Sequence, residues 1–346
     1  MTRRTLALTI GDPAGIGPEI TTRTVLEAAG PDGPARAVVV GDPVAITSAI
    51  AVLGLDAEVR AVDSWSDLPE EEAGVIDVFD TGVLGDDMVE WGVIDARAGR
   101  AAVRAIEVAT AAAMAGDVDG IVTGPINKEA IWAAGTRHLG HTELLAELTG
   151  SKRSNTMFVA RGKKIFFATR HLSLAEALTK INKEMQVVQI REALKALKIY
   201  GHDEPRLAVA AINPHGGEGG KFGTEEIDSL QPAVAEVAAE GNQVFGPVPA
   251  DSVFHQLFED RFDGVLSQYH DQGHIPAKTI DFNGTISVTV GLPILRTSVD
   301  HGTAFDIAGK AIADHGTMMS AYRAGSDFAP YADRIRADFE AGDSEA

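Results

Sequence analysis

Short apolar runs and longer helical patterns alternate along this chain, and few folds accommodate that order. The apolar runs are Thr5–Ile10, Ala37–Val40, Gly120–Val122, Lys164–Ala168, Leu207–Ile212, Gly264–Leu266 and Ile286–Val290. The helical patterns between them include Ala98–Ala115, Glu184–Leu197 and Glu225–Glu240. Alternating strands and helices predict an α/β fold with mainly parallel sheets. Several runs lack polar alternation, as strands that are covered on both faces do.

The length of 346 residues predicts two domains of roughly 150 residues or more each. No low-complexity linker separates them, so strands must carry the chain from one domain to the other. The segment Trp65–Asp87 contains three adjacent glutamates and is predicted to be a solvated surface loop. The residues after Arg334 are predicted to form a charged terminal helix.

The charge balance excludes some classes of partner. Thirty basic and fifty acidic residues give a net charge of −20, whereas nucleic acids and anionic membranes require a basic surface. There are no cysteines, so any metal must be bound by His, Asp or Glu. No apolar run approaches the ~18–20 residues of a membrane span, and the first apolar stretch is typical of a strand rather than of a signal peptide. We therefore expect a cytoplasmic protein.

A glycine-rich loop follows the first strand but does not fit a dinucleotide-binding turn. It reads Gly11-Asp-Pro-Ala-Gly-Ile-Gly-Pro-Glu19, so its order is G-x-x-x-G-x-G instead of G-x-G-x-x-G. Pro18 is compatible with the first turn of a helix. We interpret the loop as a tight strand-to-helix turn, and a role in lining a site stays open.

Three histidines stand directly after apolar runs. His171, His215 and His270 each follow a predicted strand, and ligands of open α/β sheets bind beyond the carboxyl ends of the strands. Three neutral imidazoles could hold one divalent metal and leave positions for a substrate. Such a metal would polarise a substrate hydroxyl. The alternative is that each histidine only caps a strand or fills a turn.

Cationic and polar residues occur in the same stretches. His141 and Thr142 stand at a predicted helix start, which favours anions. Lys278 and Arg296 could bind a phosphate and a carboxylate. Asp251 could orient a ligand or could cap a helix.

Six motifs in order make the chain resemble a known family. They are Gly11-Asp-Pro-Ala-Gly-Ile-Gly-Pro-Glu19, Thr123-Gly-Pro-Ile-Asn-Lys128, Gly140-His-Thr-Glu143, Asn213-Pro-His-Gly-Gly-Glu218, Tyr269-His-Asp-Gln-Gly273 and Arg296-Thr-Ser-Val-Asp-His-Gly-Thr303. The chain resembles the 4-hydroxythreonine-4-phosphate dehydrogenase family from Gly11 to about Asp314.

The resemblance implies a two-domain α/β fold like that of isocitrate and isopropylmalate dehydrogenases, with a central cleft. We place the first domain at residues 1–125 plus 285–346 and the second at 126–284. A homodimer is implied, with the metal site completed across its interface.

The resemblance also assigns site residues. The metal ligands of the family match His171, His215 and His270. The metal could be zinc, cobalt, magnesium or manganese. Contacts with the small anionic substrate carry over to His141, Thr142, Lys278 and Arg296, with Lys278 and Asp251 as catalytic candidates. Ser287 stands where the family has asparagine, and a hydroxyl cannot reproduce an amide's paired donor and acceptor.

The stretch His301–Lys310 resembles the adenosine-binding loop of isopropylmalate dehydrogenases. By that likeness Asp306 meets the adenosine ribose, and His301, Gly302, Thr303 and Ala304 line the adenine. The alternative is a helix-start loop rich in small residues. A carboxylate near the 2′ position would repel the extra phosphate of NADP, so the resemblance favours NAD.

The sequence leaves several substrates open. The stretch Tyr269–Pro276 and Phe305 resemble the branch of the family that acts on acid-sugar phosphates. That resemblance favours D-threonate or D-erythronate 4-phosphate, oxidised and decarboxylated to dihydroxyacetone phosphate and CO2. The alternatives are 4-hydroxythreonine 4-phosphate in pyridoxal phosphate biosynthesis and a cyclic dihydrodiol dicarboxylate. A metal-dependent hydrolase or aldolase without NAD, or a protein that only binds its ligand, would not need the loop His301–Lys310.

Overall fold

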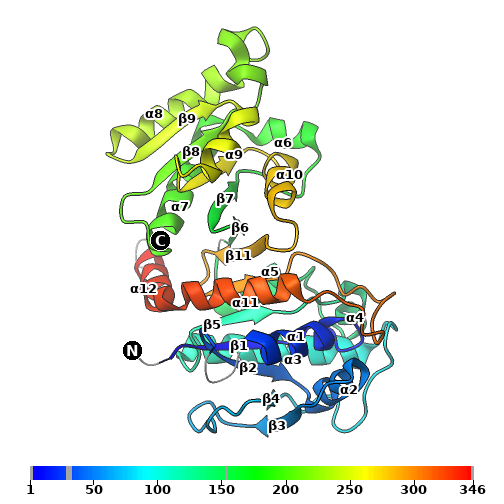
Figure 1. The fold of residues 1–346 in the computed structure, drawn as a ribbon. Coiled ribbons are helices and arrows are strands. Elements are labelled where there is room, and N and C mark those ends of the chain that lie inside the picture. Colours follow the sequence, from blue (N-terminus) through cyan, green and yellow to red (C-terminus); the bar gives the residue numbers. More distant parts are fainter. Residues whose placement is uncertain (1–2, 29–32, 153, 344–346) are drawn as a thin grey trace. The chain divides into compact units, whose positions relative to one another are not determined.

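The computed structural model describes residues 3–28, 33–152 and 154–343 and divides the chain into two compact units. Unit 1 comprises residues 1–155 and 286–346, and unit 2 comprises residues 156–285. In Figure 1, unit 1 is drawn in blue, cyan and orange to red, and unit 2 in green and yellow. Both units are α/β, as the alternation of apolar runs and helical patterns predicts. In the described ranges, no helix combines the length and the apolar character that crossing a bilayer requires.

Unit 1 has a sheet in the order β3-β4-β2-β1-β5-β12-β11, parallel except for the β11–β12 pair. Its strands are β1 (Thr5–Thr9), β2 (Arg36–Gly41), β3 (Glu58–Val62), β4 (Val75–Asp80), β5 (Gly120–Thr123), β11 (Ile286–Val290) and β12 (Arg296–Ser298). Its helices are α1 (Gly17–Ala28), α2 (Pro43–Leu53), α3 (Ala96–Ala115), α4 (Lys128–Ala133), α5 (His141–Thr149), α11 (Gly316–Phe328) and α12 (Ala332–Asp343).

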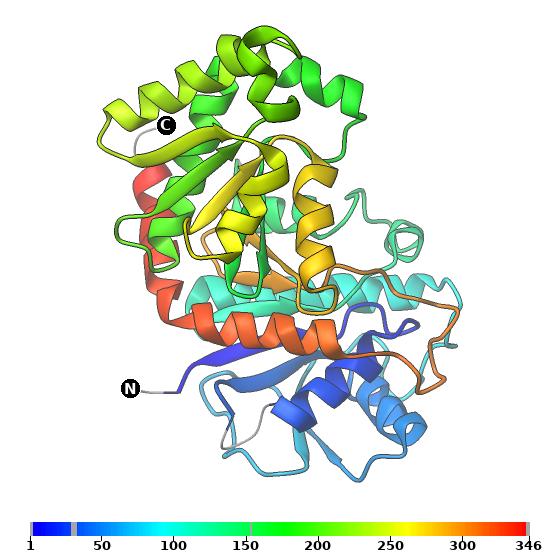
Figure 2. The same cartoon turned by 45° about the horizontal axis from the view of Figure 1, so that its top comes forward.

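Helix α3 builds the core of unit 1. Its buried face is mostly alanine and packs on β1, β2 and β5, which lets the helix approach the sheet closely. Helices α4 and α5 pack on α3 and therefore belong to unit 1. Helix α11 packs on β5, β11 and β12 and lies beside α1 (Figures 1 and 2). Helix α12 provides the charged terminal helix predicted after Arg334.

Unit 2 has a sheet in the order β6-β7-β10-β8-β9, in which only the β6–β7 pair is antiparallel. Its strands are β6 (Asn155–Ala160), β7 (Lys163–Phe167), β8 (Arg206–Ala210), β9 (Gln243–Val248) and β10 (Gly264–Ser267). Its helices are α6 (Leu174–Lys180), α7 (Lys183–Ile199), the irregular turn η1 (Pro214–Gly220), the π-helical turn η2 (Glu226–Leu230), α8 (Gln231–Ala239), α9 (Ala250–Phe258) and α10 (His270–Ile280). The pattern at Glu225–Glu240 thus begins with a π-helical turn before α8.

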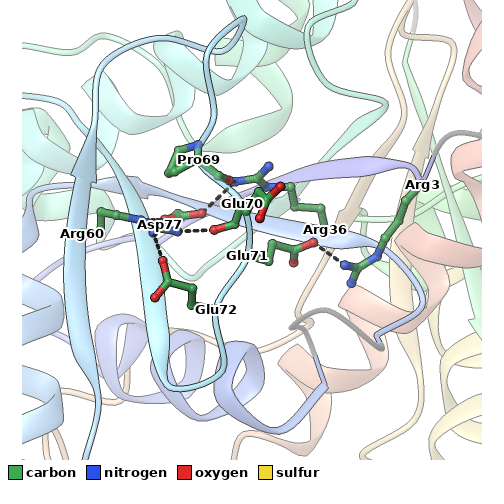
Figure 3. A network of polar contacts seen from close by, with 8 residues as sticks. All are labelled: Arg3, Arg36, Arg60, Pro69, Glu70, Glu71, Glu72 and Asp77. Carbon is green, nitrogen blue, oxygen red and sulfur yellow. Dashed lines mark hydrogen bonds and ion pairs between the residues drawn. The ribbon is translucent and has the colours of Figure 1, made fainter.

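The prediction of a solvated loop at Trp65–Asp87 is wrong for β4, which lies inside that segment. The Asp77 side chain is 5% exposed and accepts hydrogen bonds from Arg36 at 2.8 Å and from Arg60 at 2.7 Å. Arg60 also pairs with Glu72, as Figure 3 shows. The three adjacent glutamates do lie in a loop before β4, with Glu70 and Glu72 exposed. The strand after them was not expected, because the partners that let Asp77 be buried come from β2 and β3.

Candidate active site

The three predicted metal ligands of unit 2 follow three adjacent parallel strands. Strand β10 pairs with β7 on one side and with β8 on the other. His171 lies beyond the end of β7, His270 begins α10 after β10, and His215 lies in the turn η1 after β8. Because parallel neighbours end at the same edge of a sheet, these residues leave one edge from consecutive positions.

The rings of His171 and His270 lie close enough to share an ion. Their centroids are 6.1 Å apart. A metal–nitrogen distance of about 2.0–2.1 Å puts each ring centroid roughly 3.2 Å from the ion, so two liganding rings lie at most about 6.4 Å apart. The observed separation is therefore compatible with a common metal.

His270 and His215 each have a carboxylate against Nδ1. His270 Nδ1 is 2.7 Å from Asp271 Oδ1, and His215 Nδ1 is 3.1 Å from Glu218 Oε1. A carboxylate at one ring nitrogen fixes the tautomer that presents the other nitrogen to a metal, so the donor set fits a divalent cation.

His215 is placed differently from the other two. Its backbone φ of +54° belongs to a run of left-handed residues in η1, and its side chain is 68% exposed. Across the part of the chain that the structure describes, no three His, Asp or Glu side chains are gathered as a metal site. The structure brings His171 and His270 together, and His215 stays a predicted third ligand.

His274 supports the His270 ring, a role that sequence reasoning missed. The two rings stack with centroids 3.6 Å apart, and His274 also contacts the rings of Phe158 and Phe167. The four-residue spacing within α10 is the signal that could have indicated this contact.

Lys278 and Asp251 are the catalytic candidates of unit 2. Lys278 lies on α10 with its ammonium 5.7 Å from the ring centroid of Phe282. Asp251 is an exposed residue in the first turn of α9. The N-cap of α9 is Pro249, so the alternative reading of Asp251 as the capping residue is wrong.

In unit 1, Arg296 is a buried cation surrounded by neutral hydroxyls. It is 6% exposed, donates through Nε and Nη2 to Thr123 Oγ1 at 3.1 and 2.7 Å, and donates through Nη1 to Thr289 Oγ1 at 3.0 Å. Burial lowers its pKa to about 10, so the guanidinium is still charged at neutral pH. It forms no ion pair with any described carboxylate. A buried charge with only neutral partners is poised to accept an anion.

His141 lies within the electrostatic reach of Arg296. Burial, and after it the positive charge of Arg296, hold the pKa of His141 well below its ordinary value. Its Nε2 is buried and has no hydrogen-bond partner among the described residues. His141 and Thr142 open α5, whose N-terminal amides add positive potential. A neutral ring, a guanidinium and a helix start are a combination suited to a phosphate or a carboxylate.

Ser287 lies on the strand face that carries these groups. It precedes Thr289 by two residues on β11, so both side chains point to the same face, and it is paired in register with Ser298 on β12. Ser298 accepts a hydrogen bond from Thr123 at 2.9 Å. Sequence reasoning missed Thr123, Thr289 and Ser298, although Thr123 opens one of the recognised motifs.

The predicted cofactor loop is also in unit 1. His301, Gly302 and Asp306 are exposed, Thr303 is buried, and Ala304 has a φ of +42°.

The glycine-rich loop after β1 holds that segment in place. Ile16 N donates to Thr303 O at 3.0 Å, and the buried Glu19 accepts from the amides of Gly309 and Ala311 at 3.0 and 2.9 Å. A Cβ on Gly15 would lie 2.8 Å from Thr303, which explains the glycine there. The role left open by the sequence is therefore a clamp on residues 303–311.

Comparisons with known proteins identify the family of this chain. The family described as "Pyridoxal phosphate biosynthetic protein PdxA" matches residues 34–325. A relative from Cutibacterium acnes, named "Putative D-threonate 4-phosphate dehydrogenase", is 56% identical over 335 residues, which are 96% of each chain. A solved 4-hydroxythreonine-4-phosphate dehydrogenase from Klebsiella pneumoniae is 40% identical, with a TM-score of 0.88 over 95% of this chain and 98% of its own. A solved terephthalate 1,2-cis-dihydrodioldehydrogenase from Burkholderia xenovorans LB400 is 31% identical, with a TM-score of 0.63 over 94% of this chain and 98% of its own.

These likenesses confirm the fold expected from the six motifs, because the solved structures superpose over nearly the whole length of the chain. They also confirm the resemblance on which the site assignments depend. The chain therefore belongs to the PdxA family, and the relatives described above are named as dehydrogenases.

Proposed function

We propose that the chain is a divalent-metal- and NAD-dependent dehydrogenase that oxidises and decarboxylates D-threonate 4-phosphate or D-erythronate 4-phosphate, giving dihydroxyacetone phosphate and CO2. The observation that carries this proposal is the placement of His171, His270 and His215 after three adjacent parallel strands. The name of the relative at 56% identity supports the choice of D-threonate 4-phosphate. We further propose that it works in the cytoplasm as a homodimer with a shared site.

The residues of unit 2 would hold the metal and take up the proton of the substrate hydroxyl. His215 and His270 would bind the cation through the ring nitrogens that face away from their carboxylate partners, and His171 would be the third ligand. When bound, the cation supplies Lewis acidity at the substrate hydroxyl and NAD accepts the hydride. Lys278 would take the hydroxyl proton or bind the phosphate, and Asp251 would orient the ligand.

The residues of unit 1 would bind the anionic groups of the substrate and the adenosine part of the cofactor. Arg296 would hold the phosphate or the carboxylate through its planar fork, because its neutral partners leave its charge available. His141, Thr142 and Ser287 would add hydrogen bonds. His301, Gly302, Thr303 and Ala304 would line the adenine, and Asp306 would meet the ribose.

The atoms balance as an oxidative decarboxylation. The carbon that bears the hydroxyl loses a hydride and the oxygen loses a proton, which gives a β-keto acid. The bond to the carboxylate carbon then breaks, CO2 leaves, and the electron pair remains on the organic fragment as an enolate, which takes up one proton to give the ketone. The product of either four-carbon acid phosphate is dihydroxyacetone phosphate.

The test is a substrate panel. The protein is mixed with NAD, a divalent cation and each of D-threonate 4-phosphate, D-erythronate 4-phosphate, 4-hydroxythreonine 4-phosphate and a cyclic dihydrodiol. We expect NADH and CO2 with the first two, and loss of both after treatment with a chelator. If no panel member yields NADH and NAD does not raise the melting temperature, a hydrolase, an aldolase or a pure binding protein replaces this proposal.

One observation favours a second candidate. The solved structure with a TM-score of 0.88 is named as a 4-hydroxythreonine-4-phosphate dehydrogenase. Ser287 argues against this substrate, because the family has an asparagine there and the shorter hydroxyl lacks the amide's reach. A higher kcat/KM with 4-hydroxythreonine 4-phosphate than with the acid phosphates would decide for the second candidate.

A further inference from the structure

We propose that a buried network of glutamine side chains sets the spacing of the three histidine-bearing strand ends, with Gln272 as the positioning residue. The inference rests on the proposed function, since it takes the histidines as metal ligands. It concerns residues of unit 2 that touch neither metal nor substrate.

Gln272 joins the ends of two strands with one side chain. It is 7% exposed and lies in the first turn of α10. Its Oε1 accepts from the amide of Gln268 at 2.7 Å, just beyond β10. Its Nε2 donates to the carbonyl of Ala211 at 2.6 Å, just beyond β8. The distance between these two chain segments is therefore fixed by the length of one amide side chain.

Gln268 extends the network to the third strand and to a helix. Its carbonyl accepts from Thr169 Oγ1 at 2.7 Å, which ties the end of β7 to the end of β10. Its side-chain Oε1 accepts from Gln186 Nε2 at 2.7 Å, and Gln186 is a fully buried residue of α7. All three strand ends and one helix are thus linked through Gln268 and Gln272.

The tied residues lie close in sequence to the predicted ligands. Thr169 precedes His171 by two residues, and Gln268 precedes His270 by two residues. Ala211 precedes His215 by four residues.

A buried carboxylate carries the constraint further along the chain toward His215. Glu226 accepts from the amides of Ile212 and Asn213 at 2.8 and 2.7 Å and from Asn213 Nδ2 at 2.8 Å. Asn213, which Glu226 holds in place, lies two residues before His215 in the sequence.

Gln272 pairs two buried backbone groups that an apolar residue would leave unpaired. An apolar side chain of similar length could fill the volume of Gln272, but it would leave the Gln268 amide and the Ala211 carbonyl buried without partners. Directional amide bonds between strand ends instead fix orientation as well as distance. Residues that orient metal ligands from outside the coordination sphere typically change metal affinity 10–100-fold when they are replaced.

The test uses Gln272→Met, which keeps the length and removes both hydrogen bonds. Gln243→Met is the matched control, since Gln243 is exposed on the outer strand β9. Calorimetric titration with Zn²⁺, Mn²⁺ and Co²⁺, each alone, gives the metal Kd, and thermal melting without metal gives Tm. We expect Gln272→Met to weaken the Kd about 10-fold or more and Gln243→Met to leave it within about twofold.

The outcomes separate this inference from the proposed function. A lower Tm with an unchanged Kd in folded Gln272→Met would show a merely structural residue and overturn the inference, while wild-type binding would leave the proposed function standing. If Gln272→Met does not fold, Gln186→Met decides, because it removes the bond to Gln268 together with a long contact to Met185 Sδ at 3.7 Å and leaves Gln272 in place. An unchanged Kd there overturns the inference. A wild-type protein that binds neither these three cations nor Mg²⁺ overturns the proposed function, and this inference with it.

Discussion

Arg296 shows how a single residue defines a subsite in unit 1. Its guanidinium is charged, buried and bonded only to neutral hydroxyls among the described residues. We predict that Arg296→Lys raises KM for the phosphorylated substrate about 10–100-fold, because a point charge cannot reproduce a fork whose charge-assisted bonds contribute about 1.5–3 kcal/mol. Steady-state kinetics measure this, with Arg323→Lys, an exposed residue of α11, as the control. An unchanged KM would remove Arg296 from the site.

We expect His202 to give unit 2 a pH-dependent stability. Its Nε2 is 3.0 Å from Lys164 Nζ. Burial, and after it the charge of Lys164, lower the pKa of His202 below its ordinary value of 6.5. The folded chain binds this proton less readily than the unfolded chain. The contribution of the neutral His202 ring to the free energy of unfolding is therefore fully present above about pH 6.5 and is lost as the pH falls below it.

We therefore predict that Tm drops between about pH 7.5 and about pH 5.5, and that His202→Gln reduces the size of this drop. Thermal melting at several pH values measures it. His255→Gln, at an exposed position on α9, is the control and should melt like the wild type at each pH. Equal pH dependence in His202→Gln and wild type would contradict the assignment.

At the scale of elements, Glu19 at the start of α1 holds the turn that ends the predicted cofactor loop. Its two carboxylate oxygens accept from the amides of Gly309 and Ala311. In Glu19→Gln one oxygen becomes an NH₂ that faces a backbone N–H, so the turn loses a bond and gains a repulsion. We predict a Kd for NAD about 10-fold weaker, as one lost bond of about 1.4 kcal/mol gives.

Calorimetric titration with NAD measures this change. Glu192→Gln, at an exposed position on α7 in unit 2, should bind NAD like the wild type. A Glu19→Gln protein with a lower Tm and an unchanged Kd would mean that the clamp stabilises unit 1 without shaping a cofactor site.

The sequence predicts individual elements better than it predicts their neighbours. The run Gly264–Leu266 is apolar throughout and was found as β10, because a strand covered on both faces leaves that signature. Strands β3, β9 and β12 lack a continuous apolar run, since Arg60, Pro247 and Arg296 interrupt it. That β10 lies between β7 and β8 is a long-range pairing that no local pattern contains.

The same limit applies to the candidate site. The three histidines were found because each follows its own strand. The partners that hold these segments were not found, because Gln272 reaches Ala211 across 61 residues and Arg296 reaches Thr123 across 173. Buried polar contacts of this kind depend on which strands become neighbours, and the local pattern of a single sequence does not record that.

At the scale of the whole molecule, the proposed homodimer would combine residues of unit 1 and of unit 2 in one shared site. If Arg296 of unit 1 and His270 of unit 2 serve a common site across two subunits, then neither Arg296→Met nor His270→Asn is active alone. Mixing the two variants under conditions that exchange subunits should restore activity, because a mixed dimer contains one site with neither substitution.

Random pairing makes half of the dimers mixed, and one of their two sites is intact, so about a quarter of the wild-type rate is expected. The control is the double variant Arg296→Met/His270→Asn mixed with wild type, whose mixed dimers have each site damaged once. Sedimentation measures the dimer and NADH formation measures the rate. A dimer with no restored rate would place both residues in the same subunit's site, because each subunit of a mixed pair would then carry one inactivating change.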